Sequence, residues 1–154
     1  MWDYPRPPAL SPTAERVRVV HRGYVLAETT RAVRVLETSQ PPGYYIPRDD
    51  VADHVLVRSD QRTVCEWKGV ATYWSIDLRS VGGDSLTPDA AWSYEAPGSA
   101  FARIAGFLAF YAQAVDECWV DDERVAPNPG SFYGGWITSR VSGPFKGTAG
   151  TQYW

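Results

Sequence analysis

TVCEWKGVATYW, residues 63–74, is the stretch that decides the fold of this chain. Runs rich in β-branched and aromatic residues flank Lys68 and Gly69, and glycine at the second position of a two-residue turn suits a β-hairpin. The cross-strand pairs that this turn predicts are Trp67 with Val70, Glu66 with Ala71, Cys65 with Thr72, and Val64 with Tyr73. Because side chains alternate between strand faces, we expect Cys65 beside Trp67 on one face and Lys68 at the solvated tip.

Further short strands are predicted on both sides of this hairpin. They are RVRVV (16–20), YVLAE (24–28), AVRVLET (32–38), HVLVRSD (54–60), AAWSYEA (90–96), FLAFY (107–111) and ECWVDDERV (117–125), besides TVCEW and VATYWSIDL of the hairpin itself. Gly23 can take the positive φ that a turn between the first two requires. The last segment is expected to turn at Asp121–Asp122.

The connections between these strands carry the remaining signals. VGGDSLTPD (81–89) has the composition of a loop. YYI (44–46) is expected to be extended, and Pro47 suits the start of one helical turn in PRDDV. Ser99 is a suitable N-cap for one short helix that ends near Gly106.

The composition agrees with a mainly-β domain. The 154 residues include 7 Trp, 9 Tyr, 5 Phe and 16 Val, and a chain of this length buries roughly 68–70% of its unfolded surface. The net charge of −3 argues against binding to nucleic acid or to an anionic membrane. No apolar run approaches the roughly 20 residues of a membrane span, and the N-terminus does not read as a signal peptide, so we expect a cytoplasmic protein.

Neither a metal nor another cofactor is predicted. The soft and imidazole ligands of the chain are Cys65, Cys118, His21 and His54, and none of them stands at a zinc-ligand spacing. Both thiols are expected to be free and mostly buried.

Residues 1–125 are expected to form the domain, with a proline-rich N-terminal strap, and residues 126–154 an extended arm rich in glycine. The aromatic residues of the arm are Phe132, Tyr133, Trp136, Phe145, Tyr153 and Trp154. Flexible linkers are not aromatic, so this arm is predicted to pack on its own domain or on a partner subunit in a homodimer.

Several motifs in a constant order identify a family resemblance. They are WDYPRPP, VLETSQPPGYYIPRDDV, CEWKG with ATYW, AWSYEAP, IAGFLAFY, FYGGWITS and GPFKG. Together they resemble the bacterial domain of unknown function DUF427, in its long actinobacterial type. The resemblance implies a β-tent fold, in which small antiparallel sheets lean together and enclose a pocket. Relatives of that fold include zinc-bound modules, cysteine-dependent reductases and a ligand-gripping tryptophan cage, but this chain lacks the C-x-x-C pairs of the zinc members.

The predicted function is binding of a small polar or aromatic molecule. Aromatic residues beside a few charges are the usual composition of a small-molecule pocket. The predicted lining residues are Tyr45, Arg48, Trp67, Lys68, Tyr73 and Trp92. Arg48 and Lys68 would hold an anionic group, and the aromatic faces would stack on the ligand or hold a cation.

Two alternatives from other classes remain open. A metal-free enzyme would use Cys65 as a nucleophile or redox thiol and Glu66 or Lys68 as a proton carrier. An interaction module would instead bind a partner protein through the aromatic arm. Each of these residues also has a purely structural interpretation: Cys65 would be a packing residue, and Glu66 and Lys68 would be solvated charges.

Overall fold

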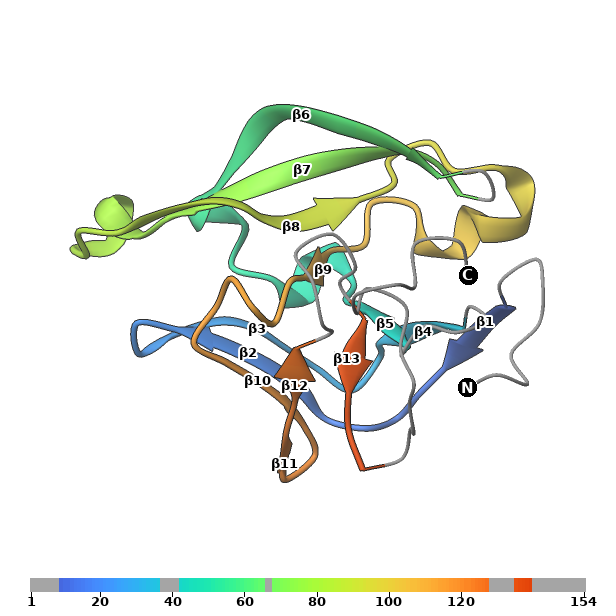
Figure 1. Ribbon diagram of the computed structural model, residues 1–154, viewed down its shortest axis with the longest axis horizontal. Helices are drawn as coiled ribbons and strands as arrows, with labels where there is room; N and C mark the ends of the chain where they lie inside the picture. Colours follow the sequence, from blue (N-terminus) through green and yellow to red (C-terminus); the bar gives the residue numbers. More distant parts are fainter. Residues whose placement is uncertain (1–8, 37–41, 66–67, 128–134, 140–154) are drawn as a thin grey trace, which may run out of the picture.

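The computed structural model describes residues 9–36, 42–65, 68–127 and 135–139. Within these ranges the protein consists of antiparallel β-sheets joined by short 3₁₀ helices, which confirms the mainly-β class. Figure 1 shows one long sheet lying as a layer over two smaller sheets set side by side. No helix among the described residues is long and apolar enough to cross a membrane.

The long sheet contains the hairpin of residues 63–74. Its strands, in spatial order, are β6 (Leu56–Cys65), β7 (Gly69–Asp77), β8 (Leu86–Ser93) and β9 (Ala109–Phe110). The three long strands follow each other along the chain, whereas β9 returns from a later segment to pair with β8. β9 therefore brings the residues that follow it next to this sheet.

Two further sheets form the opposite layer. One has the order β11 (Glu123–Arg124), β10 (Glu117–Val120), β2 (Val17–His21), β3 (Tyr24–Thr29), and the other has the order β1 (Ala9–Pro12), β4 (Val33–Leu36), β5 (Gly43–Tyr45). A small ribbon pairs β12 (Ala126–Pro127) with β13 (Trp136–Ile137). All these pairings are antiparallel.

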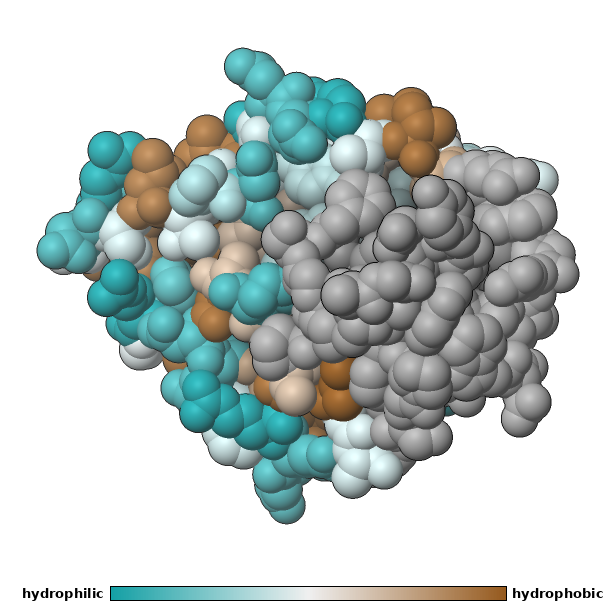
Figure 2. Space-filling model, in the orientation of Figure 1, coloured by the Kyte–Doolittle hydropathy of each residue, from teal (hydrophilic) through white to brown (hydrophobic). Residues whose placement is uncertain are grey.

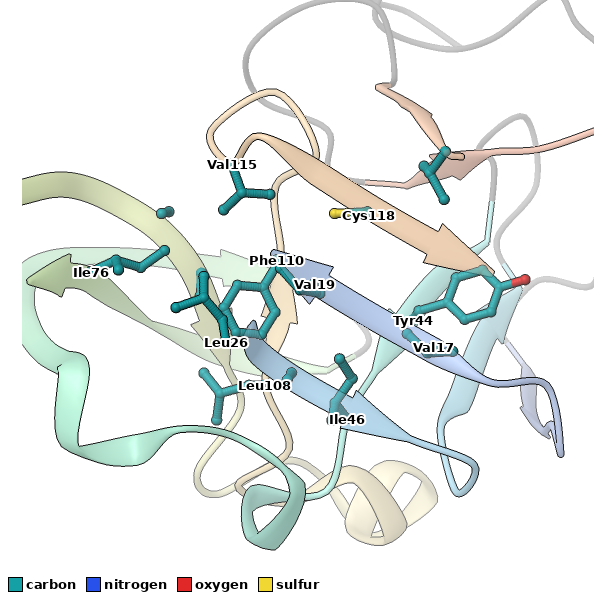
Figure 3. Packing of buried hydrophobic residues seen from close by; sticks show 14 of the residues in the cluster. Val17, Val19, Leu26, Tyr44, Ile46, Ile76, Leu108, Phe110, Val115 and Cys118 are labelled. Carbon is teal, nitrogen blue, oxygen red and sulfur yellow. The ribbon is translucent and has the colours of Figure 1, made fainter. Parts of the chain in front are cut away.

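The main core fills the space between the long sheet and the β2–β3–β10 sheet. Figure 3 shows Phe110 between Val19 of β2 on one side and Leu26 of β3 on the other, with Ile76 of the long sheet beyond Leu26. All four side chains are at most 1% exposed. Burying side chains of this kind contributes about 1.5–3 kcal/mol each from transfer out of water, which is the principal force holding the layers together.

Two turns formed as their residues predict. Arg22 and Gly23 both have positive φ, 53° and 75°, between β2 and β3, as a two-residue hairpin turn requires. Asp121 has φ 53° at the turn between β10 and β11, where Val120 pairs with Glu123. Asp is one of the few residue types other than glycine that adopts this conformation without great strain.

The register of the hairpin that opened the sequence analysis was predicted wrongly. The observed pairs are Cys65 with Gly69, Val64 with Val70, Thr63 with Ala71 and Arg62 with Thr72. Three residues, 66–68, therefore connect the strands, and Gly69 closes the loop at φ 99°. The difference from the predicted register is three residues, an odd number, so Cys65 moves to the face of Ala71 and Tyr73.

Three further predictions about local structure need correction. Residues 56–60 of HVLVRSD and 63–65 of TVCEW belong to the single strand β6, while His54 and Val55 lie in a 3₁₀ helix before it. Residues 86–89, expected in a loop, belong to β8. The helix after Pro97 is a 3₁₀ helix, η4 (Ser99–Ile104), and its cap position is Gly98, not Ser99. The other 3₁₀ helices are η1 (Arg48–Asp50), which follows Pro47 as predicted, η2 (Asp53–Val55) and η3 (Leu78–Val81).

The described part of the predicted arm packs on the domain. The Trp136 side chain is 1% exposed, its ring stacks on Tyr44 at 5.1 Å, and its indole nitrogen donates to the Phe110 carbonyl at 2.9 Å. The other five aromatic residues of the arm lie outside the described residues, and their packing stays a prediction.

Exposed hydrophobic residues are few in the described part of the chain, and two of them, Val64 and Val70, are cross-strand partners. The six described residues of this kind are Val25, Val57, Val64, Val70, Val81 and Leu86. In the view of Figure 2, hydrophobic residues form separate patches between hydrophilic ones on the surface that is not grey. None of the six is aromatic, and most aromatic residues of the described chain are buried or half-buried.

Candidate functional site

A second cluster of buried residues is dominated by aromatic rings and lies between the long sheet, β4 and β5. Trp92 on β8 donates from its indole nitrogen to the Tyr45 hydroxyl on β5 at 3.0 Å, and the two rings meet edge to face. Trp92 also contacts Tyr111, with ring centroids 4.5 Å apart. Three of the predicted lining residues, Tyr45, Tyr73 and Trp92, therefore belong to one cluster.

The cluster continues from Trp92 to a pair of tyrosines. The rings of Tyr73 and Tyr111 lie within 8° of parallel, with centroids 6.4 Å apart. The Tyr111 hydroxyl donates to the Tyr73 hydroxyl over a long 3.5 Å, and the Tyr73 hydroxyl is 2.9 Å from Thr63 Oγ1. Burial, followed by the hydrogen bond to Tyr73, raises the pKa of Tyr111. Its phenol therefore remains a neutral donor at neutral pH.

A cavity of about 220 Å³ opens where these two tyrosines end the cluster. Its walls are Gln61, Thr63, Tyr73, Asp89, Tyr111, Gln113 and Ala114. Gln61, Thr63 and Tyr73 come from the long sheet, while Tyr111, Gln113 and Ala114 follow β9. Ligand pockets are usually lined by apolar and aromatic side chains with a few polar groups, whereas this lining is mostly polar with two aromatic rings. Its volume is also below the roughly 300–1,000 Å³ of drug-sized sites.

Two β-bulges shape this cavity. On β6, residues 59–61 lie opposite the single residue Tyr73, and on β8, residues 88–90 lie opposite the single residue Ser75. Each bulged segment supplies one wall residue, Gln61 from β6 and Asp89 from β8. Bulges re-aim side chains and occur preferentially beside functional sites.

Asp89 combines backbone strain with an unpaired polar atom. Its φ is 49°, an uncommon value inside a strand that costs on the order of 1 kcal/mol or more. Its amide donates to Ser75 Oγ at 3.2 Å, which helps to hold the bulge. Its carboxylate oxygen Oδ1 is buried and has no hydrogen-bond partner among the described residues. A buried oxygen without a partner costs about 1–3 kcal/mol, so the position is unfavourable unless a donor reaches it.

Arg48 lies elsewhere, at a separate cavity of about 360 Å³. The walls of that cavity are Arg31, Val33, Pro47, Arg48, Asp49, Arg103, Ala105 and Phe107. Its guanidinium pairs with Asp53 at 2.8 Å and stands over the Trp74 ring at 4.6 Å. Arg48 and Tyr73 thus share no cavity wall, and the structure does not bring these two predicted site residues together.

The other residues singled out in the hairpin divide into two groups. Lys68, expected at a solvated tip, is only 3% exposed, and its ammonium stands 5.7 Å from the centre of the Tyr94 ring. Tyr94 packs in the aromatic cluster with Tyr45, so Lys68 lies at an edge of the cluster. Glu66 and Trp67 lie outside the described residues, and their predicted roles stay predictions.

The two cysteines occupy different environments. Cys65 is half-buried and packs against the aromatic cluster, on the side of Tyr73. Cys118 lies in the main core, and burial raises the pKa of its thiol to about 12. Among the described residues, no group of three or more His, Cys, Asp or Glu side chains gathers as metal ligands would.

The comparison with protein families adds one finding to this geometry. The family model described as a domain of unknown function (DUF427) matches residues 9–121. The chain belongs to the DUF427 family. A comparison with curated proteins found no match. The matched range contains both bulges, the aromatic cluster and the cavity beside Tyr111, so these features lie within the DUF427 domain itself.

Of the seven residues that line this DUF427 cavity, sequence reasoning identified only Tyr73, and the two missed residues that matter most are Asp89 and Tyr111. Asp89 stands in LTPD, which has the composition of a loop and gives no sign of a bulged strand. Tyr111 was included in a predicted strand, but only the return of β9 to the long sheet places it against Trp92. Its amide donates to the Ala90 carbonyl of the β8 bulge at 2.9 Å, which fixes it beside Asp89.

Proposed function

We propose that this DUF427 domain binds a small polar molecule in the cavity between Tyr73 and Tyr111. The observation that carries the proposal is that two tyrosines, a threonine and an aspartate line one cavity of about 220 Å³, with the three hydroxyls joined by short and long contacts. The ligand would stack on an aromatic ring and exchange hydrogen bonds with these groups. Such a volume suits a small ligand, equal to about seven water molecules at ~30 Å³ each.

Rigidity of the wall supports the proposal. Tyr73 and Tyr111 are 7% and 9% exposed and are held from behind by Trp92, which is itself fixed by its hydrogen bond to Tyr45. Side chains fixed in this way lose little conformational freedom when a ligand binds, and the cost of binding is lowered accordingly.

Arg48, one of the two positive charges expected at the pocket, has other partners. Arg48 is held by Asp53, lies 3.9 Å from Glu95 and donates to the Gly106 carbonyl. The proposed ligand does not depend on Arg48. Tyr45 and Trp92 then act as positioning residues for the tyrosine pair, not as direct contacts.

A fragment screen on the intact chain tests the proposal. The melting temperature would be measured with a library of small polar and aromatic compounds. We expect hits whose stabilising effect is lost in Ala114→Leu, because the larger side chain fills the cavity. Ala105→Leu, the same change at the wall of the Arg48 cavity, is the matched control and should leave the hits unaffected. Hits that survive Ala114→Leu but disappear in Ala105→Leu would contradict the proposal.

A further inference from the structure

We infer that the cavity beside Tyr111 takes the protonated nitrogen of a small amine, with the Asp89 carboxylate as its acceptor. This inference rests on the proposed function and narrows its ligand to one chemical class. It depends on the charge of the wall, the unpaired oxygen of Asp89 and the bulge that presents Asp89.

The charge of the wall selects a cation. Asp89 is the only charged side chain among the described residues that line the cavity; the others are two amides, a threonine, two tyrosines and an alanine. Tyr111 remains neutral and adds no charge of its own. A carboxylate beside aromatic faces attracts a cation and repels an anion, because the face of an aromatic ring is its negative side.

The unpaired oxygen selects a cation that carries N–H bonds. Oδ1 of Asp89 is buried without a donor among the described residues, and a buried acceptor is stabilised when a ligand supplies one. A primary ammonium group offers three N–H donors, so it can pair with the Asp89 carboxylate and still donate to a hydroxyl oxygen of Tyr73 or Thr63, which line the same cavity. A quaternary ammonium group has the charge but no N–H, and should bind less well.

The backbone of the β8 bulge holds Asp89 in a defined position at the cavity. Residues 88–90 lie opposite Ser75, and Asp89 in the middle of this bulge has a positive φ of 49°. The Ala90 carbonyl accepts a hydrogen bond from the Tyr111 amide, and the Ser75 hydroxyl accepts one from the Asp89 amide. On β6, the Arg62 guanidinium donates to the carbonyls of Ser59 and Gln61, so the second bulge is stabilised by a cation bound to backbone.

A matched set of probes tests the inference on the full chain. Benzylamine, benzyltrimethylammonium, benzyl alcohol and benzoate share one ring and differ in charge and in donors. Binding would be followed by amide chemical shifts, with Thr63 and Ala114 as reporters of the cavity. We expect benzylamine to bind most tightly, benzyl alcohol and benzyltrimethylammonium more weakly, and benzoate most weakly.

Asp89→Asn is the decisive variant, because asparagine keeps the shape and also tolerates positive φ. It should weaken benzylamine binding at least tenfold and leave benzyl alcohol binding within about twofold, while the spectrum away from the cavity stays unchanged. Equal binding of benzylamine and benzyl alcohol, or no effect of Asp89→Asn on benzylamine, would overturn the amine inference and leave the cavity as a site for neutral ligands. Absence of shifts with benzylamine up to millimolar concentration would overturn it too, whereas the proposed function is judged separately by the library screen.

Discussion

The indole nitrogen of Trp92 and the hydroxyl of Tyr45 are 3.0 Å apart, and this hydrogen bond joins the long sheet to the β1–β4–β5 sheet. Both side chains are buried, at 8% and 3% exposure. Trp92 also contacts Tyr111, which lines the cavity, so the pair that ties the two layers together also supports one side of the site.

Tyr45→Phe should destabilise the fold by about 1–3 kcal/mol, because it leaves the buried Trp92 N–H without its acceptor. Urea unfolding measures this as a lower midpoint with an unchanged slope. Tyr24→Phe is the matched control: the Tyr24 hydroxyl meets the exposed His54 at 2.8 Å, and its loss should cost less. Equal effects of the two changes would show that the Trp92–Tyr45 bond contributes nothing beyond an ordinary surface contact.

Trp136→Ala should cost about 3–5 kcal/mol, since a fully buried indole and its bond to the Phe110 carbonyl are lost. Deletion of residues 126–154 removes the same indole and should lower the melting temperature at least as much as Trp136→Ala does. The mass in solution decides where the arm acts: an unchanged mass after deletion means that it stabilises its own domain. A fall from dimer to monomer would favour the interaction module instead.

Thiol labelling of the native protein should modify Cys65 well before Cys118. Cys118 is 2% exposed and its raised pKa keeps it protonated, whereas Cys65 is half-buried. We expect one reactive thiol per native chain and two after denaturation. Cys65→Ser should leave ligand binding intact. Loss of a measurable activity in folded Cys65→Ser, with Ala114→Leu tolerated, would establish the thiol enzyme and refute the binding site.

The same thiol predicts a loss of stability at alkaline pH. Burial raises the pKa of Cys118 from its ordinary 9.0 to about 12, so above pH 9.0 the unfolded chain releases this proton before the folded one. The free energy of unfolding should therefore fall by about 1.4 kcal/mol per pH unit from this group until pH reaches about 12. Tyr111 acts in the same direction above its ordinary pKa of 10.0.

Cys118→Ala should make this decline shallower, although its stability at neutral pH is lower. Val19→Ala, at the position paired with Cys118, lowers stability by a cavity alone and should keep the full slope. If both variants and the natural chain share one alkaline slope, the thiol does not titrate as its burial predicts.

Local signals in the sequence were sufficient for much of the fold. Gly23 marked its hairpin turn, and the pair at Asp121 marked another, because only a few residue types accept positive φ. The hairpin of residues 63–74 formed, but Lys68–Gly69 looked like a complete two-residue turn, and nothing local distinguishes it from a three-residue loop closed by glycine. That ambiguity moved Cys65 to the other face.

The site was less accessible to sequence reasoning than the fold. Tyr45, Tyr73 and Trp92 were identified by their residue type and do share a cluster. Arg48 was assigned to the same pocket because charges near aromatics suggest a site, yet its distance from Tyr73 depends on how the sheets are placed. Asp89 and Tyr111 meet only through a bulge and a non-sequential strand pairing, and neither leaves a periodic signal.

The measurement that tests the central claim most directly is amide chemical-shift mapping of a stabilising fragment on the full-length protein. The account predicts that the largest shifts fall on Thr63, Asp89 and Ala114, around the Tyr73–Tyr111 pair, and that Ala114→Leu abolishes them. Shifts confined to Arg103, Ala105 and Phe107, at the Arg48 cavity, with the tyrosine-lined cavity unmoved, would contradict it.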